Sequence, residues 1–186
     1  IEGKGNVAKR IADILPSVAE ERKIQVIQAL GELGQKNAGA ALLNEANVGS
    51  LPIRIAALRA AVRLGYEEVI PVLTVLLSAE DADLVRTARE GLSYFPGKAG
   101  DNTVLELLKS NDAQIRLTAV ELVSQGALPT PADLLLELAN NDAEEAVRLA
   151  ALKGAKEYVG IPHLSTLLSH LLKPRSNDEL AAAEEA

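Results

Sequence analysis

The sequence predicts an all-α fold in which two-helix repeats stack into an α-α superhelix, a solenoid. The segment IRIAALRAAVRLG at 53–65 recurs, in looser form, at 22–34, 85–97, 115–126 and 147–160. The basic residue near the start of each copy returns after 31, 32, 30 and 32 residues. A near-constant period of this length is typical of solenoids, whose units bury their apolar faces only by stacking. No segment alternates strictly between apolar and polar residues, so we expect no strands.

The composition agrees with helix-on-helix packing. Almost half of the 186 residues are apolar, yet only four are aromatic and none is Trp. Such a core consists of Leu, Ala, Val and Ile. Small residues recur two, three and six places after the basic residue, as Ala56, Ala57 and Ala60 do in the second copy. They allow neighbouring helices to approach closely.

The first quarter of the chain shows helix-start and helix-stop signals. An apolar face at helical spacing predicts a helix over 6–15, with Asn6 as its N-cap and Pro16 as its end. Ser17 and Glu20 have the spacing of a capping box, which would open the next helix. A short helix follows at about 38–47. Ser50 and Pro52 then open the second copy of the repeat.

Further along, each repeat has a leucine-rich helix followed by a helix that carries the basic residue. We call this following helix the second helix of the repeat. Leucine-rich segments lie at 70–78, 104–110 and 161–169, and Thr130 with Pro131 would open another before the run LLLEL. Asp and Asn in the turns at 79–81, 111–112 and 140–142 favour helix initiation. The second helices are predicted near 18–34, 51–65, 82–97, 112–126, 142–160 and, opened by a capping box of Ser176 and Glu179, at 177–186. Gly65, Gly126, Gly160 and the pair Pro96-Gly97 are predicted C-caps.

We predict a single repeat array over 1–186. Because the array stops partway through its sixth second helix, we expect the chain to be a fragment of a longer protein with flanking domains. The start at Ile1 and the lack of any Met favour the same interpretation. The apolar face of the last helix, with Leu180 and Ala183, would then lack its packing partner.

These features resemble HEAT repeats of the short bacterial type related to lyase-associated arrays. The residues that carry the resemblance are Ile53-Arg54 with Ala56, Ala57 and Ala60, Val85-Arg86, Ile115-Arg116 with Ala119, and Val147-Arg148 with Ala150 and Ala151. Lys23 replaces Arg in the first copy, and the 85–97 copy slips by one residue. The resemblance implies an α-α superhelix, basic residues paired with turn carboxylates, and second helices on the concave side. It implies no single function, because such arrays act as scaffolds, lyase relatives and DNA-repair relatives.

Composition also bounds the function. The net charge of −7 argues against nucleic acid as the partner, since nucleic-acid binders usually carry a basic face. Without cysteines there is no disulfide, thiolate metal site or thiol nucleophile. His163 and His170 could supply two metal ligands, but no third ligand converges with them. We therefore expect structural roles for both and no metal site. No apolar run is long enough for a membrane span. The compartment stays open between cytoplasm and a bacterial envelope or periplasm.

The exposed strip of the second helices is the candidate binding surface. The positions five and nine places after the basic residue should form one row on the concave face of the array. We predict partner-binding residues Arg59, Arg63, Glu90, Tyr94, Glu121, Gln125, Lys153 and Glu157, with Gln28 and Glu32 in the first copy. The charge-mixed row suits a protein or peptide partner. We therefore expect a non-enzymatic interaction or scaffold module without a cofactor. The alternatives are an accessory array of a bacterial hydrolase or lyase-like enzyme, and a nucleic-acid-binding HEAT-like protein.

Overall fold

A computed structural model describes residues 2–127 and 132–186, with side chains over 7–125 and 132–186. Within these ranges the chain is helical, and no residue lies in a strand. This confirms the predicted all-α class. The chain divides into two compact units, Ile1–Asp101 and Asn102–Ala186. That the two form one continuous array stays a prediction.

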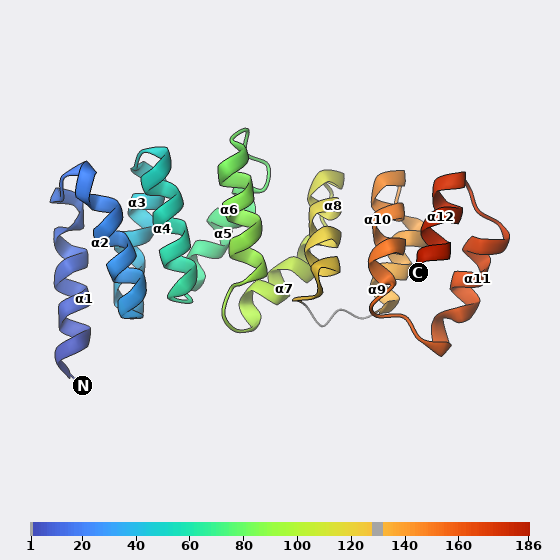
Figure 1. Ribbon diagram of the computed structural model, residues 1–186, viewed down its shortest axis with the longest axis horizontal. Coiled ribbons are helices and arrows are strands. Elements are labelled where there is room, and N and C mark those ends of the chain that lie inside the picture. Colours follow the sequence, from blue (N-terminus) through green and yellow to red (C-terminus); the bar gives the residue numbers. More distant parts are fainter. Residues whose placement is uncertain (1, 128–131) are drawn as a thin grey trace. The chain divides into compact units, whose positions relative to one another are not determined.

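The first unit contains two layers of helices. Its elements are α1 (Glu2–Ile14), α2 (Glu20–Leu33), α3 (Gly39–Val48), α4 (Leu51–Arg63), α5 (Ile70–Leu76) and α6 (Ala82–Ser93), with 3-10 turns at Leu15–Ser17, Lys36–Ala38 and Glu67–Val69. The second helices α2, α4 and α6 stand side by side in one layer, and α3 and α5 lie behind them (Figure 1). Helix α7 (Lys98–Leu107) crosses the boundary between the units.

The second unit repeats this arrangement. It contains α8 (Ala113–Leu122), which continues into a π-helical turn at Val123–Ala127, then α9 (Ala132–Asn141) and α10 (Glu145–Ala155). A 3-10 turn at Ile161–His163 leads into α11 (Leu164–Leu172), and α12 (Asn177–Glu185) follows. Helix α10 packs on α8, α9 and α12. The predicted caps Thr130 and Pro131 lie outside the described residues.

Each core is built from the periodic residues of both layers. Leu30, Leu42, Leu58, Leu73 and Leu92 are fully buried in the first unit. The small residues act as predicted: a Cβ on Gly31 would lie 3.2 Å from the Cβ of Ala60, so α2 and α4 touch almost backbone to backbone. This close approach would not accommodate a larger side chain.

Several predicted helix starts are wrong in detail. Helix α1 begins at Glu2, so Asn6 lies inside it and is not its N-cap. Ser17 does not cap α2 but donates its hydroxyl to the carbonyl oxygen of Ile14 at 2.8 Å, which keeps it in the preceding turn. Asp81 and Asp112 do cap α6 and α8, each accepting two backbone N–H groups. An aspartate in the turn thus predicted the start of a helix better in this chain than Asn6 or the capping box at Ser17 did.

The helix ends also divide into correct and incorrect predictions. Gly65 has a positive φ of 62° and directly follows Leu64, the C-cap of α4, as predicted. Gly97 also has a positive φ, of 84°, but it lies three residues beyond Tyr94, the C-cap of α6, and does not end that helix. Gly160 has φ −151° and is extended, because it leads into a 3-10 turn rather than ending a helix. Ala183 is buried because α12 packs on both α10 and α11, so the expected lack of a partner for this face was wrong.

An apolar face is instead exposed on the leucine-rich segment of the second unit. Ile161, Leu164 and Leu168 are between 50% and 85% exposed. The matching residues of the first unit, Ile70, Leu73 and Leu77, are all buried. The two segments have similar sequences, but Ile70 begins α5 whereas Ile161 begins the 3-10 turn that precedes α11. The same residue types therefore lie at different points of their helices.

Candidate functional site

Most of the basic residues that mark the repeat have structural partners. Lys23 bridges both carboxylate oxygens of buried Glu45 at 3.1 Å. Arg54 donates through Nε to the carbonyl oxygen of Ala46 at 3.0 Å, and Arg148 donates to that of Asp142 at 2.8 Å. These arginines satisfy backbone carbonyls where the preceding helix ends, which would otherwise lack donors. They hold the repeats and are not available for a ligand.

Arg116 makes the strongest of these contacts. Its Nε and Nη2 atoms each lie 2.7 Å from one oxygen of Asp142, and its Nη1 donates to the carbonyl oxygen of Ser110 at 2.8 Å. The hydrogen bond to Asp142 raises the pKa of Arg116 further above its usual range. The same bond, working against burial, holds the pKa of Asp142 below its ordinary value. Both groups therefore stay charged, and the pair links two consecutive repeats.

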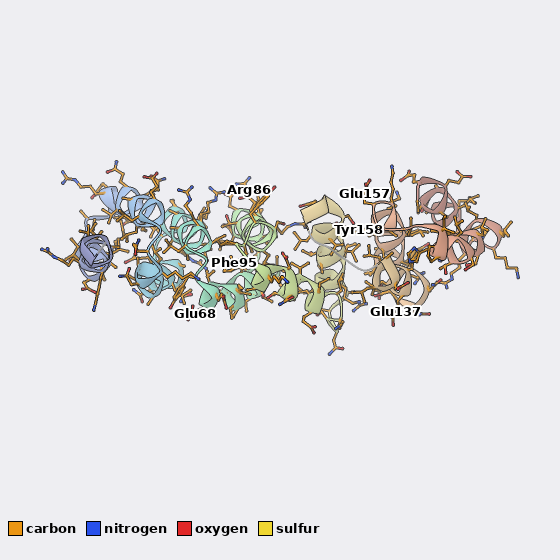
Figure 2. The ribbon with its side chains drawn as sticks, turned by 90° about the horizontal axis from the view of Figure 1, so that it is seen from below. Glu68, Arg86, Phe95, Glu137, Glu157 and Tyr158 are labelled. Carbon is orange, nitrogen blue, oxygen red and sulfur yellow. The ribbon has the colours of Figure 1, made fainter. Side chains whose placement is uncertain are left out.

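Arg86 is the exception, and the one-residue slip of its repeat explains why. Adding the repeat length to the buried residues Ile53, Ala57 and Ala61 of α4 gives Leu84, Ala88 and Leu92, which are the buried residues of α6. Val85 thus occupies the structural position of Arg54. Arg86 lies at the outer edge of the unit, whereas Phe95 of the same repeat points inward (Figure 2). The Arg86 side chain is 62% exposed, and its Nη2 lies 2.7 Å from Asp83 Oδ1.

The structure places the predicted row of binding residues on the surface of the second helices. Arg59, Arg63 and Tyr94 are exposed, and the side chain of Glu90 is 45% exposed. In the second unit Gln125, Lys153 and Glu157 are exposed and Glu121 is partly exposed. The first four residues come together in one place, because α4 and α6 are neighbours. The other four lie in the second unit, and their part in binding stays a prediction.

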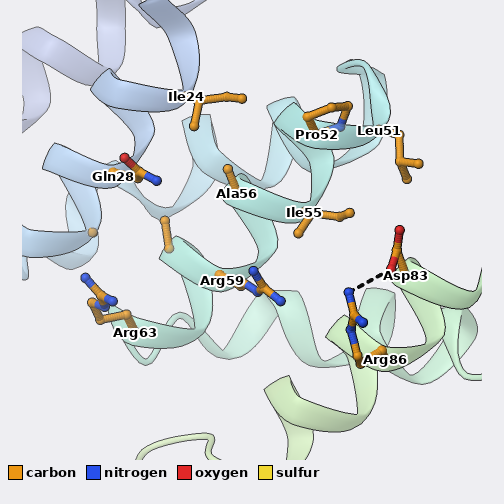
Figure 3. A pocket seen from close by; sticks show the side chains of 12 residues that line it. Ile24, Gln28, Leu51, Pro52, Ile55, Ala56, Arg59, Arg63, Asp83 and Arg86 are labelled. Atoms are coloured by element: carbon orange, nitrogen blue, oxygen red, sulfur yellow. Dashed lines mark hydrogen bonds and ion pairs between the residues drawn. The ribbon is translucent and has the colours of Figure 1, made fainter.

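Two hollows flank α4 and share Arg59 and Arg63. The larger, of about 580 Å³, lies over α2, α4 and the start of α6 (Figure 3). Its lining includes Ile24, Leu51, Ile55, Ala56 and Ala60, with Gln28 and the arginines at its edges. The smaller, of about 320 Å³, lies between α4 and α6 and is lined by Val62, Thr87, Glu90, Gly91 and Tyr94 besides the two arginines. We call the two hollows together the α4 groove.

Ion pairs connect the charges at the α4 groove. Arg59 Nη2 lies 3.2 Å from Glu90 Oε2, and Arg86 Nε lies 4.0 Å from the other oxygen of Glu90. Arg63 forms no ion pair or hydrogen bond through its side chain within the described residues. One arginine of the groove is therefore unpaired, and a second shares its carboxylate with Arg86.

Sequence reasoning missed three features of this groove. The sequence predicts that Arg86 pairs with turn carboxylates as the other basic residues of the repeat do, but the burial pattern shows that the slip places Val85 at the structural position. Leu51 and Ile55 precede Arg59 at four-residue steps, a pattern that could have identified an apolar extension of the row. Thr87 lines the smaller hollow with a buried hydroxyl that has no hydrogen-bond partner in the described part of the chain.

The two histidines do not form a common site. His163 accepts a hydrogen bond at Nδ1 from the Gly160 N–H, and its Nε2 lies 3.4 Å from Asp133. His170 is buried, and its Nδ1 lies 2.5 Å from Glu179 Oε1. Glu179 also accepts the Arg175 N–H at 2.6 Å, so the final helix is held by a buried pair rather than by the full capping box. Ser176 makes its half of that box, accepting the Glu179 N–H at 3.2 Å. Among the described residues no group of three acidic, His or Cys side chains could hold a metal ion.

Among the described helices, none has the length and apolar character that crossing a membrane requires.

A model of HEAT repeats matches residues 8–93, and no curated protein matches the sequence. Among solved structures, an engineered protein is similar with a TM-score of 0.44 at 16% identity, over 96% of this chain and 94% of that one. Human deoxyhypusine hydroxylase, solved with glycerol, is similar with a TM-score of 0.45 at 14% identity, over 97% of this chain and 76% of that one. The family model therefore identifies HEAT repeats over residues 8–93.

Proposed function

We propose that this chain is a non-enzymatic protein-binding module and that the α4 groove of its first unit binds a peptide segment of a partner protein. The observation that carries the proposal is the groove itself: two adjoining hollows with an apolar floor, bordered by exposed arginines and Tyr94. HEAT repeats commonly mediate protein interactions, which supports the same role.

The size and lining of the groove suit such a role. Volumes of about 580 and 320 Å³ lie in the range of known ligand sites. Protein interfaces combine an apolar centre with a polar rim, and Arg and Tyr are enriched among the residues that dominate binding energy. Arg59 and Arg63 supply such side chains in the hollow that Ile55 and Ala56 also line, and Tyr94 supplies one in the smaller hollow. A partner could bury apolar surface and form ion pairs in one place.

The charge pattern favours a protein over a polyanion. Tracking a phosphate backbone requires several aligned cations. In the α4 groove, however, Asp83 and Glu90 alternate with the arginines and pair with two of them. The chain as a whole carries −7. A polypeptide with both apolar and charged side chains matches this mixed surface better than a nucleic acid does.

Selection from a random peptide library displayed on phage, against the immobilised full chain, would test the proposal. The test variant is the double charge reversal Arg59→Glu with Arg63→Glu. The matched control is Lys9→Glu with Arg10→Glu, which makes the same change of charge at exposed residues of α1 outside the groove. We expect selected peptides to bind the unmodified chain and the control but not the groove variant.

Both variants should retain the stability of the unmodified chain, because exposed substitutions usually change it by less than about 0.5 kcal/mol. Peptides that bind the groove variant as well as the unmodified chain would contradict the proposed site. Mass spectrometry of the captured peptides tests the non-enzymatic part: unchanged masses are expected, and cleaved or modified peptides would show that the array is catalytic.

A further inference from the structure

We infer that the α4 groove selects an extended acidic segment in which one apolar side chain and two carboxylates occupy alternate positions. This inference rests on the proposed function and specifies its ligand. It follows from the spacing of four residues along α4, from the position of the hollows between neighbouring helices and from the unpaired positive charge.

The exposed edge of α4 carries a regular row. Leu51, Ile55, Arg59 and Arg63 follow one another at four-residue steps, and all four line the larger hollow. Residues four apart on a helix share a face and are separated by about 6 Å along the axis. Alternate residues of an extended chain are about 6.6 Å apart and also share a face. An extended segment laid along α4 therefore matches the row: an apolar side chain at Ile55 and carboxylates at Arg59 and Arg63.

The position of the hollows favours an extended ligand over a helical one. They lie between neighbouring second helices, whose axes are typically about 8–10 Å apart. A helix with its side chains is about 10–12 Å wide and would rest on top of this gap. An extended segment can lie along α4 with the alternate side chains of one face directed at the larger hollow, which Ile24 and Ala56 also line.

The charge at the groove calls for an acidic ligand. Its three arginines, Arg59, Arg63 and Arg86, face two carboxylates, Asp83 and Glu90. Arg63 has no partner among the described residues, and Glu90 serves both Arg59 and Arg86. The slip of the third repeat creates this excess, because it moves the arginine out of its structural position and onto the groove. Carboxylates bind guanidinium groups through short, charge-assisted hydrogen bonds.

The carboxylate of Glu90 then competes with a ligand carboxylate for Arg59. The Glu90 carboxylate lies 3.2 Å from the Arg59 side chain that the ligand would use. A ligand carboxylate must displace Glu90 from Arg59, whereas Arg63 needs no such exchange. Removing the charge of Glu90 should therefore strengthen binding of an acidic segment, which a merely structural role of Glu90 would not predict.

Fluorescence polarisation with a labelled peptide containing the sequence LSESE would test the inference. Three comparison probes are LSQSQ, which lacks the charges, LEESS, which has the same composition at the wrong spacing, and a ten-nucleotide single strand of thymidines. The protein variants are Arg63→Gln and Glu90→Gln, with Lys9→Gln as the control that removes an exposed cation outside the groove.

We expect LSESE to bind more tightly than the three comparison probes. Arg63→Gln should weaken its binding about fivefold and Glu90→Gln should strengthen it about two- to fivefold, the size of one exposed ion pair. Lys9→Gln should leave the dissociation constant unchanged. High salt should weaken LSESE binding and leave LSQSQ unaffected, because salt screens exposed charges.

Equal binding of LSESE and LEESS would overturn the inferred spacing, and tighter binding of the oligonucleotide would overturn the choice of an acidic peptide. If LSESE fails to bind while library peptides still depend on Arg59 and Arg63, the acidic specificity is wrong and the proposed function stands. If no peptide depends on these two arginines, both proposals fall.

Discussion

The ion pair between Arg116 and Asp142 should contribute more to stability than any exposed pair of this chain, and Asp142→Asn tests this. The substitution removes the charge of Asp142 and leaves that of Arg116. The two side chains are only 14% and 3% exposed, and both oxygens of Asp142 accept at 2.7 Å. Arg116 would keep its hydrogen bonds to the Ser110 carbonyl oxygen and to the remaining side-chain oxygen, but its Nε would face the amide NH2 of Asn, which is also a donor.

The structure sets the size of the expected loss. Removing one partner of a buried pair costs about 3–5 kcal/mol. Because the Arg116 side chain retains some contact with solvent, we expect about 2–3 kcal/mol for Asp142→Asn. Asp142 also accepts the Glu144 N–H at 2.9 Å, a bond that Asn can keep and Ala cannot. Asp142→Ala should therefore cost roughly 1 kcal/mol more.

Hydrogen exchange followed by mass spectrometry measures this loss locally, which suits a chain with two compact units. Amides of α8 and α10 should lose protection by roughly thirty- to a hundred-and-fiftyfold in Asp142→Asn, whereas those of α2 and α4 should not change. The control is Glu106→Gln, which breaks the pair of Glu106 with Lys109. Both side chains of that pair are more than half exposed, so the cost should be below about 0.5 kcal/mol.

The pair should also be sensitive to acid. The pKa of Asp142 is lowered by its hydrogen bond with Arg116, so its contribution is complete above the ordinary pKa and is lost as the pH falls through the lowered value. The difference between Asp142→Asn and the unmodified chain should therefore shrink below about pH 4. A stability loss no larger than that of Glu106→Gln, or a difference that does not change in acid, would refute the reasoning.

Two further predictions concern a buried pair and a buried hydroxyl. Burial raises the pKa of Glu179, but hydrogen bonds from His170 and Arg175 hold it below its ordinary value overall. Acid below about pH 4 should therefore reduce the hydrogen-exchange protection of α12 more than that of α2. His170→Ala should cause a similar loss in α12 at neutral pH, because it leaves the carboxylate of Glu179 buried with one fewer partner; unchanged protection would count against this. Thr87→Val should raise the free energy of urea unfolding by about 1 kcal/mol, because it replaces an unpaired buried hydroxyl by a methyl group of similar size; a loss of stability would mean that the hydroxyl has a partner.

The repeat period and the residue types predicted the helices well, for a local reason. Asp81 and Asp112 cap the helices that follow them, and Gly65 ends its helix in the left-handed conformation. These signals depend on hydrogen bonds and backbone sterics within a few residues. The capping box at Ser17 failed because Ala19 is the N-cap of α2, while Ser17 stays in the preceding 3-10 turn and donates its hydroxyl to the Ile14 carbonyl oxygen. A spacing rule does not determine at which residue the helix begins.

The candidate site was only half predictable. Counting from the basic residue identified Arg59, Arg63, Glu90 and Tyr94, because equivalent positions of stacked repeats fall on one face. It could not show that Glu90 pairs with Arg59 across two repeats, nor that Arg63 lacks a partner. Those facts depend on the relative placement of α4 and α6, which are separated by a whole leucine-rich helix in the sequence.

The sequence by itself thus determined the fold class and the exposed positions of the second helices, since both follow from periodicity and local backbone chemistry. Only the tertiary structure decided which arginines hold the repeats and which face a groove. Arg116 and Arg86 look equivalent in the sequence, yet one is bound to Asp142 of the next repeat and the other is exposed beside Glu90. The physical reason is that a one-residue slip turns a helical side chain by about 100°, and packing of the buried residues Leu84, Ala88 and Leu92 fixes where that turn leaves it.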